Sequence, residues 1–485
     1  MESAIAWLDS TIAIDIADFG AYFEKSLSLE ALGRQAEAAA VKEELHKLMR
    51  DEARNYLALA SDYAAAGMYT EAAIIVNDAP EKAAMDPMIH YTKAYLYGKL
   101  AMEEEMNLAL SSAAAASPDY CFPNRLFELD VLNYAVKVSP NDAKAHYYLG
   151  NLLYDKKRHK EAILCWETSR ELDDSYSVVH RNLALAYYNK LNKPDEALDS
   201  LKKAFACNSG NARVFYELDQ LHKKLNTPSD LRLALMNANT ALIVQRDDLY
   251  LEYVTLHNTL KRHEDALRLI EDRIFHPWEG GEGKVTGQYV LAKVELAKQA
   301  IADGQYVKAV ESLREATVYP LNLGEGKLAG AQENHIYYYL GCAYESLGLT
   351  KEAEEAFAAA AYGLDEPASA MYYNDQPPEM IYYQGLAWNK LGNVKEAARR
   401  FHKLINYAEK HLFDDVKIDY FAVSLPDFLV FDDDLNRRNV IHCRYMRALG
   451  LLGLNRVPEA AEDFRKVLEL DPNHQGVLFH GEVNI

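Results

Sequence analysis

One pattern of aromatic and small residues returns about every 35 residues along this chain, and it dominates what the chain can fold into. Leu340 and Tyr344 lie four residues apart in the clearest copy, so they share one face of a helix. A small residue such as Gly341 lets two helices approach closely, and Gly348 suits the end of a helix. The pattern therefore predicts stacked pairs of helices. The clearest copy reads Tyr337, Leu340, Gly341, Tyr344, Gly348, Ala353, Phe357, Ala360.

Further copies extend this pattern over most of the chain. The clear ones span 56–72, 146–166, 180–187 and 382–401, with a repeat ending at 460–472. Weaker copies start near Ala21, Pro87, Asn211 and Leu291. The pattern resembles the tetratricopeptide repeat, a helix–turn–helix unit of 34 residues. The resemblance implies an all-α solenoid of helical hairpins, wound as a right-handed superhelix with roughly ten repeat units.

We expect four sections along this solenoid. They are degenerate N-terminal repeats at 1–140, central repeats at 141–275, long repeats with Gly-Glu-Gly-Lys loops and an apolar insertion at 276–432, and a C-terminal repeat and cap at 433–485.

Composition excludes several classes of partner. The net charge is −21, which argues against nucleic acid and against an anionic membrane surface. The five cysteines are isolated from one another, as expected of buried thiols in a reducing compartment. The histidines show no metal-ligand spacing, and no cofactor loop is evident. The N-terminus lacks a basic signal region and no apolar run reaches membrane length, so we expect a cytoplasmic protein.

Two loops that interrupt the repeat share one sequence. Within the loops 273–284 and 318–327, residues 276–284 align with 319–327, and both loops end in Gly-Glu-Gly-Lys. We expect the two loops to emerge on the same side of the solenoid, as neighbours. Each Lys is followed by an apolar residue, Val285 or Leu328, where a phosphate-binding loop needs Ser or Thr. Nucleotide hydrolysis is therefore disfavoured.

Two interpretations of these loops stay open. In the structural one, Gly283 and Gly326 permit tight turns, each Lys starts the next helix, and Glu282 and Glu325 lie near a helix N-terminus. In the other, the loops form a composite pocket whose Trp stacks on a sugar ring or an apolar side chain. Its charged groups bind hydroxyls or a partner's charges. Catalysis by paired Glu residues is the least favoured reading. The candidate pocket residues are His276, Trp278, Glu279, Glu282, Lys284, Asn322, Glu325 and Lys327.

Two further segments depart from the repeat. Residues 372–378 form another long inter-repeat loop. Residues 419–431 are too apolar for a solvated loop, so we expect them to fold back over a groove or an end of the solenoid.

The loop sequences carry a second, more specific resemblance. Residues 276–284, 322–327 and 419–427, together with 119–125, resemble the repeat region of a bacterial family of unknown function. In that family an N-terminal β-rich domain, similar to galactose-mutarotase-like sugar-binding domains, precedes tetratricopeptide repeats. Nothing before Gly20 is long enough to hold such a domain. We therefore expect a truncated chain or a stand-alone relative, without the activity of that domain.

A second candidate site lies on the concave face. Tetratricopeptide domains that clamp a peptide C-terminus use Lys and Asn on successive first helices, and Asn151 and Asn182 match the two Asn positions. Paired Asn side chains can grip an extended backbone. The match is partial, because Tyr147 and Glu217 stand where the clamp carries basic residues, and a solvated polar groove is the alternative. The candidate groove residues are Asn151, Arg181, Asn182 and Arg213.

The sequence as a whole favours a non-catalytic scaffold that binds a protein or peptide partner through its concave groove and inter-repeat loops. The alternative is an accessory module of a bacterial carbohydrate-processing system, which binds a sugar or docks a sugar-binding β-domain. An enzyme is the least favoured class.

Overall fold

The computed structural model describes residues 1–369, 375–417 and 430–481, and within these ranges all regular structure is helical. It contains α-helices and short 3₁₀-helices, with no strand in the described ranges. The predicted all-α architecture of helical hairpins is confirmed. Most of the apolar segment 419–431 and part of the loop 372–378 lie outside the described residues, so their predicted roles stay predictions.

The chain divides into two compact units, Met1–Lys190 and Leu191–Ile485, which are described one at a time. The boundary falls inside the predicted central section 141–275.

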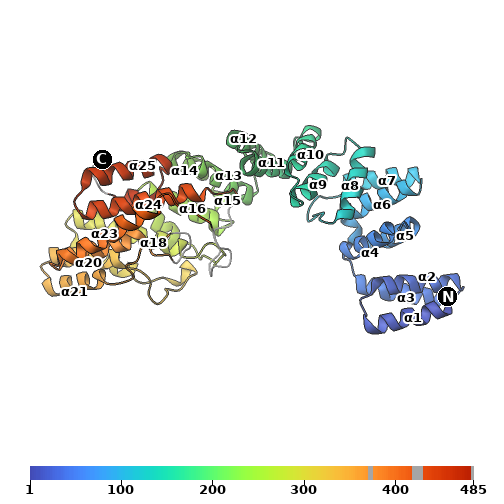
Figure 1. Cartoon of the computed structure of the whole chain (residues 1–485), viewed down its shortest axis with the longest axis horizontal. Coiled ribbons are helices and arrows are strands. Elements are labelled where there is room, and N and C mark those ends of the chain that lie inside the picture. Colours follow the sequence, from blue (N-terminus) through green and yellow to red (C-terminus); the bar gives the residue numbers. More distant parts are fainter. Residues whose placement is uncertain (370–374, 418–429, 482–485) are drawn as a thin grey trace. The chain divides into compact units, whose positions relative to one another are not determined.

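In the first unit, consecutive helices pack as hairpins (Figure 1). The pairs are α2 with α3, α4 with α5, α6 with α7, and α9 with α10. The helices are α1 (Glu2–Ile14), α2 (Phe19–Ala31), α3 (Gln35–Met49), α4 (Ala53–Ala65), α5 (Tyr69–Asn77), η1 (Ala83–Met85), α6 (Pro87–Lys99), α7 (Glu103–Ala115), α8 (Leu126–Val138), α9 (Ala143–Asp155), α10 (His159–Leu172) and α11 (Ser177–Leu191).

The second unit continues the same architecture, with hairpins formed by α16 and α17, α18 and α19, α20 and α21, α22 and α23, and α24 and α25. Its helices are α12 (Pro194–Cys207), α13 (Ala212–Lys224), α14 (Ser229–Asn237), α15 (Thr240–Ile243), α16 (Asp247–Thr259), α17 (His263–Glu271), α18 (Lys284–Ala302), α19 (Tyr306–Ala316), η2 (Leu321–Leu323), α20 (Asn334–Ser346), α21 (Thr350–Ala361), α22 (Pro378–Lys390), α23 (Val394–His411), α24 (Leu435–Gly453), α25 (Val457–Leu470) and α26 (Gln475–His480).

The small residues of the repeat pattern bring the two helices of a hairpin together, as predicted. A Cβ placed on Gly341 would lie 2.5 Å from the ring of Phe357 on the second helix. Gly150 stands in the same relation to Trp166, again with a Cβ contact of 2.5 Å. Each aromatic ring therefore rests directly on the backbone of the first helix, which fills the core between the helices.

The turns between consecutive helices share a left-handed residue. Gly348 has a φ of 74° in the turn of the clearest repeat, whereas Lys261 adopts a φ of 59° in the turn between α16 and α17. That hairpin was not among the predicted copies, although it lies within the predicted central section 141–275. Lys157 has a φ of 63° in the turn between α9 and α10, so the left-handed backbone of these turns does not depend on glycine.

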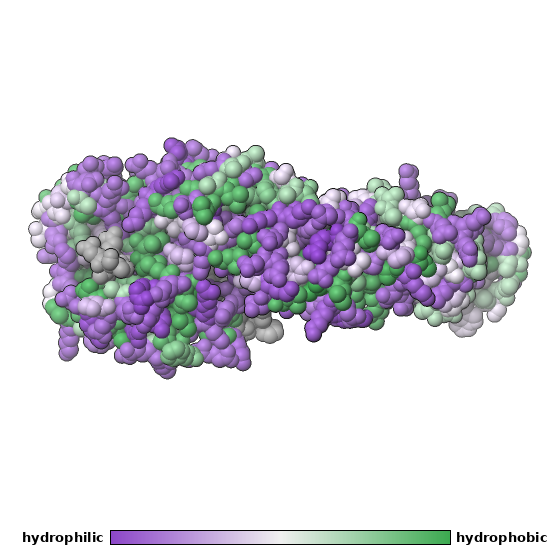
Figure 2. Space-filling view, turned by 90° about the horizontal axis from the view of Figure 1, so that it is seen from above, coloured by the Kyte–Doolittle hydropathy of each residue, from purple (hydrophilic) through white to green (hydrophobic). Residues whose placement is uncertain are grey.

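Charged and polar side chains cover much of the outer surface. Figure 2 shows hydrophilic side chains spread over the face that it displays, interrupted by smaller hydrophobic areas. This distribution agrees with the net charge of −21.

Candidate functional site

The two Gly-Glu-Gly-Lys loops are neighbours in the second unit, as predicted. The Glu325 carboxylate accepts the Gly283 N–H, with its two oxygens 3.0 and 3.1 Å from the nitrogen. The Phe275 N–H donates to the carbonyl oxygen of Asn322 over 2.8 Å. Gly324 has a φ of 79°, and a Cβ there would lie 2.5 Å from the Phe275 carbonyl oxygen. The loops are therefore packed backbone against backbone.

The predicted helix start holds for the first loop and is wrong for the second. Gly283 has a φ of 71° and precedes α18, whose first residue is Lys284. Helix α20 begins only at Asn334, well beyond Lys327. The Lys327 ammonium instead donates to the Thr317 carbonyl oxygen over 2.8 Å and pairs with Glu333 at 2.6 Å. These two bonds hold the stretch that leads into α20 in a non-helical path.

Glu325 lies at a helix N-terminus, but at that of the neighbouring loop. It binds the N–H of Gly283, the residue that precedes α18, where negative charge is favourable. Burial raises the pKa of the Glu325 carboxyl, and the nearby charge of Glu282 raises it further, while the Gly283 hydrogen bond opposes both effects. The carboxylate thus joins the two loops.

His276 and Asn322 also make hydrogen bonds that stabilise the conformation of the loops. The Asn322 amide donates to the carbonyl oxygens of Ile270 and Arg273 over 2.9 and 3.0 Å, which satisfies groups at the end of α17. The backbone N–H of His276 donates to the Asp247 carboxylate over 3.0 Å, and its ring Nδ1 lies 3.1 Å from the same oxygen.

The remaining loop residues divide between core and surface. Trp278 is half-buried against the hydrophobic core, with its ring so close to Gly281 that a Cβ there would lie 2.2 Å away. That contact occupies part of the aromatic surface that a sugar ring would need. Glu279 and Glu282 are exposed. Lys284 is exposed on the same loop, so the loop surface carries both signs of charge, and the composite pocket stays a prediction.

In the first unit, the structure brings the two predicted groove asparagines together. The Asn182 amide donates to the Asn151 side-chain oxygen over 3.0 Å, and the Trp166 indole N–H donates to the same oxygen over 3.0 Å. The Asn151 oxygen is therefore engaged inside the fold and orients Asn182. The neighbouring Arg181 is half-buried.

Arg213 belongs to the second unit, which is described by itself. Its guanidinium donates to Glu217 over 3.1 Å, and the Glu217 side chain is buried. The positive charge of Arg213, a candidate residue for a peptide clamp, is therefore paired with Glu217 within α13.

Sequence reasoning missed one surface of the second unit. The first helices of successive hairpins, α16, α18, α20, α22 and α24, contact one another in order, and together they form what we call the inner face. The chain's own last helix, α26, lies on this face. Gln475 donates from its amide to the Thr259 hydroxyl over 3.1 Å and accepts from the Gln288 amide over 2.9 Å.

The end of α26 is held by both polar and apolar contacts. The Lys298 ammonium donates to the Phe479 carbonyl oxygen over 2.7 Å, where a cation complements the C-terminal end of a helix. The Phe479 side chain is only 2% exposed, and its ring centroid lies 5.5 Å from that of His263. The Tyr383 hydroxyl and the His480 Nδ1 are 2.9 Å apart.

The stretch that leads into α26 is anchored to helices far away in the sequence. Asn226 donates from its amide to the Leu470 carbonyl oxygen over 3.4 Å, and the Ser229 hydroxyl donates to Asn473. In Figure 1 the red helix α25 accordingly lies beside the green helix α14. The only sequence signal for this arrangement is the apolar run Val477-Leu478-Phe479 after the Asp471-Pro472 repeat ending.

Several histidines at the inner face have lowered pKa values. Burial and, to a smaller extent, the charge of Lys298 together lower the pKa of His335 to about 4. Burial also lowers the pKa of His474 and of His480. The His474 Nδ1 accepts the Val477 N–H over 3.2 Å, a bond that requires the neutral ring.

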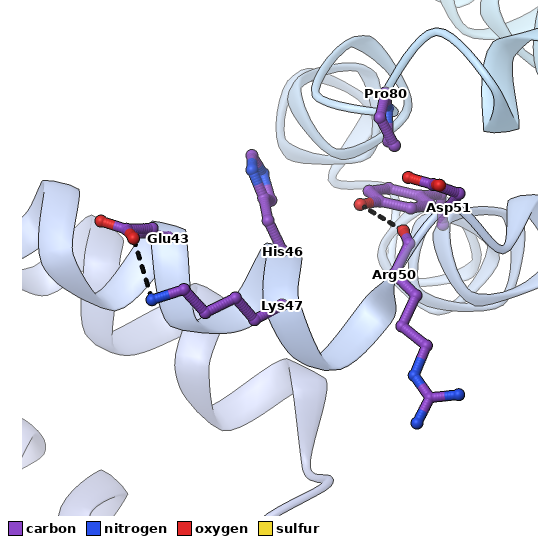
Figure 3. Close-up of a pocket in the computed structure, with 7 residues that line it drawn as sticks. Glu43, His46, Lys47, Arg50, Asp51 and Pro80 are labelled. Carbon is purple, nitrogen blue, oxygen red and sulfur yellow. Dashed lines mark hydrogen bonds and ion pairs between the residues drawn. The ribbon is translucent and has the colours of Figure 1, made fainter.

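The first unit carries a shallow hollow of about 420 Å³ between α3, α4 and Pro80 (Figure 3). The Tyr56 hydroxyl donates to the Arg50 carbonyl oxygen over 3.2 Å, and Lys47 pairs with Glu43 at 2.8 Å. Figure 3 shows the Arg50 guanidinium pointing away from Asp51. The polar groups that line the hollow do not converge on one point, as a ligand site would need.

Among the residues that the structure describes, no group of three or more His, Cys, Asp or Glu is arranged to hold a metal ion. In that part of the chain, no helix combines the length and the apolar character needed to cross a bilayer. The five cysteines are free thiols.

Comparison with known proteins places one hairpin in a family. Residues 143–176, which contain α9 and α10, match the tetratricopeptide repeat. This match and the helical hairpins support an all-α tetratricopeptide solenoid, a fold that serves protein interaction. The predicted relation to a family with a galactose-mutarotase-like domain is not shown.

Solved structures similar to this chain include other tetratricopeptide proteins. The TPR domain of P58(IPK) is 14% identical over 95% of both chains, with a TM-score of 0.26. YrrB, described as a TPR protein with an unusual peptide-binding site, is 20% identical over 43% of this chain and 96% of its own, with a TM-score of 0.21. TTC0263, a thermophilic TPR protein of Thermus thermophilus, is 19% identical over 42% of this chain and 98% of its own, with a TM-score of 0.25.

Proposed function

We propose that this chain is a non-catalytic scaffold that binds a segment of a partner protein on the surfaces formed by its repeated hairpins. One observation carries the proposal: the inner face of the second unit already holds a short segment, α26. It does so through side-chain hydrogen bonds from successive first helices and through burial of the Phe479 ring. Such a combination is the chemistry that groove recognition of a helical peptide requires.

In the first unit, the proposed contact residues are Arg181 and Asn182. Asn151 takes a positioning role, because its side-chain oxygen holds the Asn182 amide. An amide and a guanidinium side by side offer donors to the carbonyl groups of an extended partner. In the second unit, the exposed Glu279, Glu282 and Lys284 form a charged rim that favours a partner surface of complementary charge.

The proposed place of action is the cytoplasm. Five free thiols, of which Cys121 and Cys443 are buried, suit a reducing compartment.

The experiment is affinity capture from the source lysate by the immobilised full chain, with quantitative mass spectrometry. The variant is Arg181→Ala/Asn182→Ala, and the matched control is Lys351→Ala/Glu355→Ala, an exposed ion pair on α21. We expect a protein that the parent and the control capture and that the variant loses, at an unchanged melting temperature. Equal capture by all three proteins, or no captured protein, contradicts the proposal for this groove.

A further inference from the structure

We propose that residues 471–481 are an exchangeable internal ligand of the inner face, and that the partner they exclude is a short amphipathic helix of the same chemistry. This inference rests on the proposed function and gives the class of ligand that the inner face accepts.

Helix α26 depends on its contacts with the inner face to stay helical. Helix α26 has six residues, far fewer than an isolated helix needs to be stable in water. Its bonds to the inner face run mainly through side chains, from Thr259, Gln288 and Lys298. A segment held in this way can leave without breaking the hydrogen bonds inside the hairpins beneath it.

The contacts of α26 indicate which kind of helix the inner face can bind. Gln475 and Phe479 lie four residues apart and so share one face of α26. The Gln475 amide contacts the Thr259 hydroxyl and the Gln288 amide, and the Phe479 ring is buried beside the ring of His263. The Lys298 ammonium donates a hydrogen bond to the Phe479 carbonyl oxygen at the end of the helix. A helix with a carboxamide, an aromatic residue four positions later, and a free C-terminal carbonyl beside it meets all three requirements.

The internal ligand leaves part of the site unsatisfied. Among the described residues, the buried His335 Nδ1 and the buried Asn473 Nδ2 have no hydrogen-bond partner. A buried polar group without a partner lowers the stability of the bound state. His335 belongs to this site, because its charge contributes to lowering the pKa of His480 on α26. A partner helix that offers a hydrogen bond to the His335 nitrogen is therefore expected to bind more tightly than the chain's own segment.

The test uses the full chain and a fluorescent peptide of residues 471–481, Asp-Pro-Asn-His-Gln-Gly-Val-Leu-Phe-His-Gly. Peptide binding is measured by anisotropy for the parent and for Phe479→Ala, which weakens the internal ligand. We expect the variant to bind the peptide at least tenfold more tightly. Adding Gln288→Ala to the variant should reduce this affinity at least fivefold, whereas adding the exposed control Val307→Ala should leave it unchanged.

Hydrogen exchange of the parent chain tests the inference even if the Phe479→Ala variant does not fold. In the parent chain, amide hydrogens of α26 should exchange at least tenfold faster than those of α18, because an exchangeable segment opens without global unfolding. Equal protection of the two helices would overturn the inference, as would a folded Phe479→Ala variant that binds the peptide no better than the parent.

The two proposals fail in different ways. A partner captured by the full chain, together with no peptide binding to the Phe479→Ala variant, would overturn this inference and leave the proposed function standing. Failure of partner capture and of peptide binding together would overturn both.

Discussion

Two glycines of the second unit look alike in sequence and differ in what their backbones touch. Gly341 lies on α20 under the Phe357 ring, with a Cβ contact of 2.5 Å, whereas Gly287 on α18 has nothing within 4 Å of a Cβ. A methyl group therefore meets a packed ring at the first position and open space at the second. This difference distinguishes the close approach within a hairpin from an ordinary helical glycine.

The first prediction follows at the residue scale. Gly341→Ala should lower the free energy of unfolding by about 1–3 kcal/mol, because the hairpin must separate to admit the methyl group. Gly287→Ala, the matched control, should raise it by about 0.5–1 kcal/mol through its better helix propensity. Urea denaturation measures both values. Changes of the same sign in the two variants would contradict the packing described for α20 and α21.

At the scale of elements, α13, α14 and α16 are joined by a buried ion network. The Arg232 guanidinium pairs with Asp219 at 2.6 Å and with Glu252 at 3.1 Å, and the Arg232 and Asp219 side chains are only 2% and 1% exposed. Removal of one member leaves a buried charge without its counter-ion, which costs more than the net value of the pair.

The second prediction concerns this network. Arg232→Met should destabilise the second unit by about 3–5 kcal/mol, and the double variant Arg232→Met/Asp219→Leu should recover a large part of the loss. Arg268→Met, which removes an exposed partner of Asp265, should change stability by less than about 1 kcal/mol. Thermal unfolding followed by calorimetry gives all three values. A double variant that is less stable than Arg232→Met alone would show that the ion network is stabilising in itself.

At the scale of the whole molecule, the second unit carries a set of neutral histidines at its inner face. An unfolded histidine binds a proton near pH 6.5, whereas the pKa of His335 in the folded chain is about 4. Between these pH values the unfolded state binds more protons, so stability falls as the pH falls from about 6.5 toward 4. The neighbouring ammonium of Lys298 acts in the same direction.

The third prediction is therefore acid lability of the second unit. The His335 shift alone should cost about 2 kcal/mol at pH 5 relative to pH 7. His335→Gln should weaken this pH dependence, while His46→Gln, at an exposed position of the first unit, should leave it unchanged. Calorimetric scans at pH 7 and pH 5 test the expectation. An identical loss of stability in the parent and in His335→Gln would exclude His335 as a source of the effect.

The sequence by itself determined the helical hairpins, because each depends on residues close together in the chain. Small residues such as Gly341 and Gly150, set opposite an aromatic ring, mark where two helices approach. The hairpin at Lys261 was not among the predicted copies, although its turn has the same left-handed backbone. Even the neighbouring loops were predictable, because two consecutive repeats carry the same loop sequence.

Only the tertiary structure decided what the candidate side chains do. Lys327 and Asn322 have the chemistry of ligand-binding residues, but carbonyl groups brought close by folding engage both of them. Helix α26 is held on the inner face by contacts between distant parts of the chain, such as those of Gln475 with Gln288 and of Asn473 with Ser229. Local periodicity predicts which residues are helical. Which helix covers which surface depends on long-range packing, and no local pattern records it.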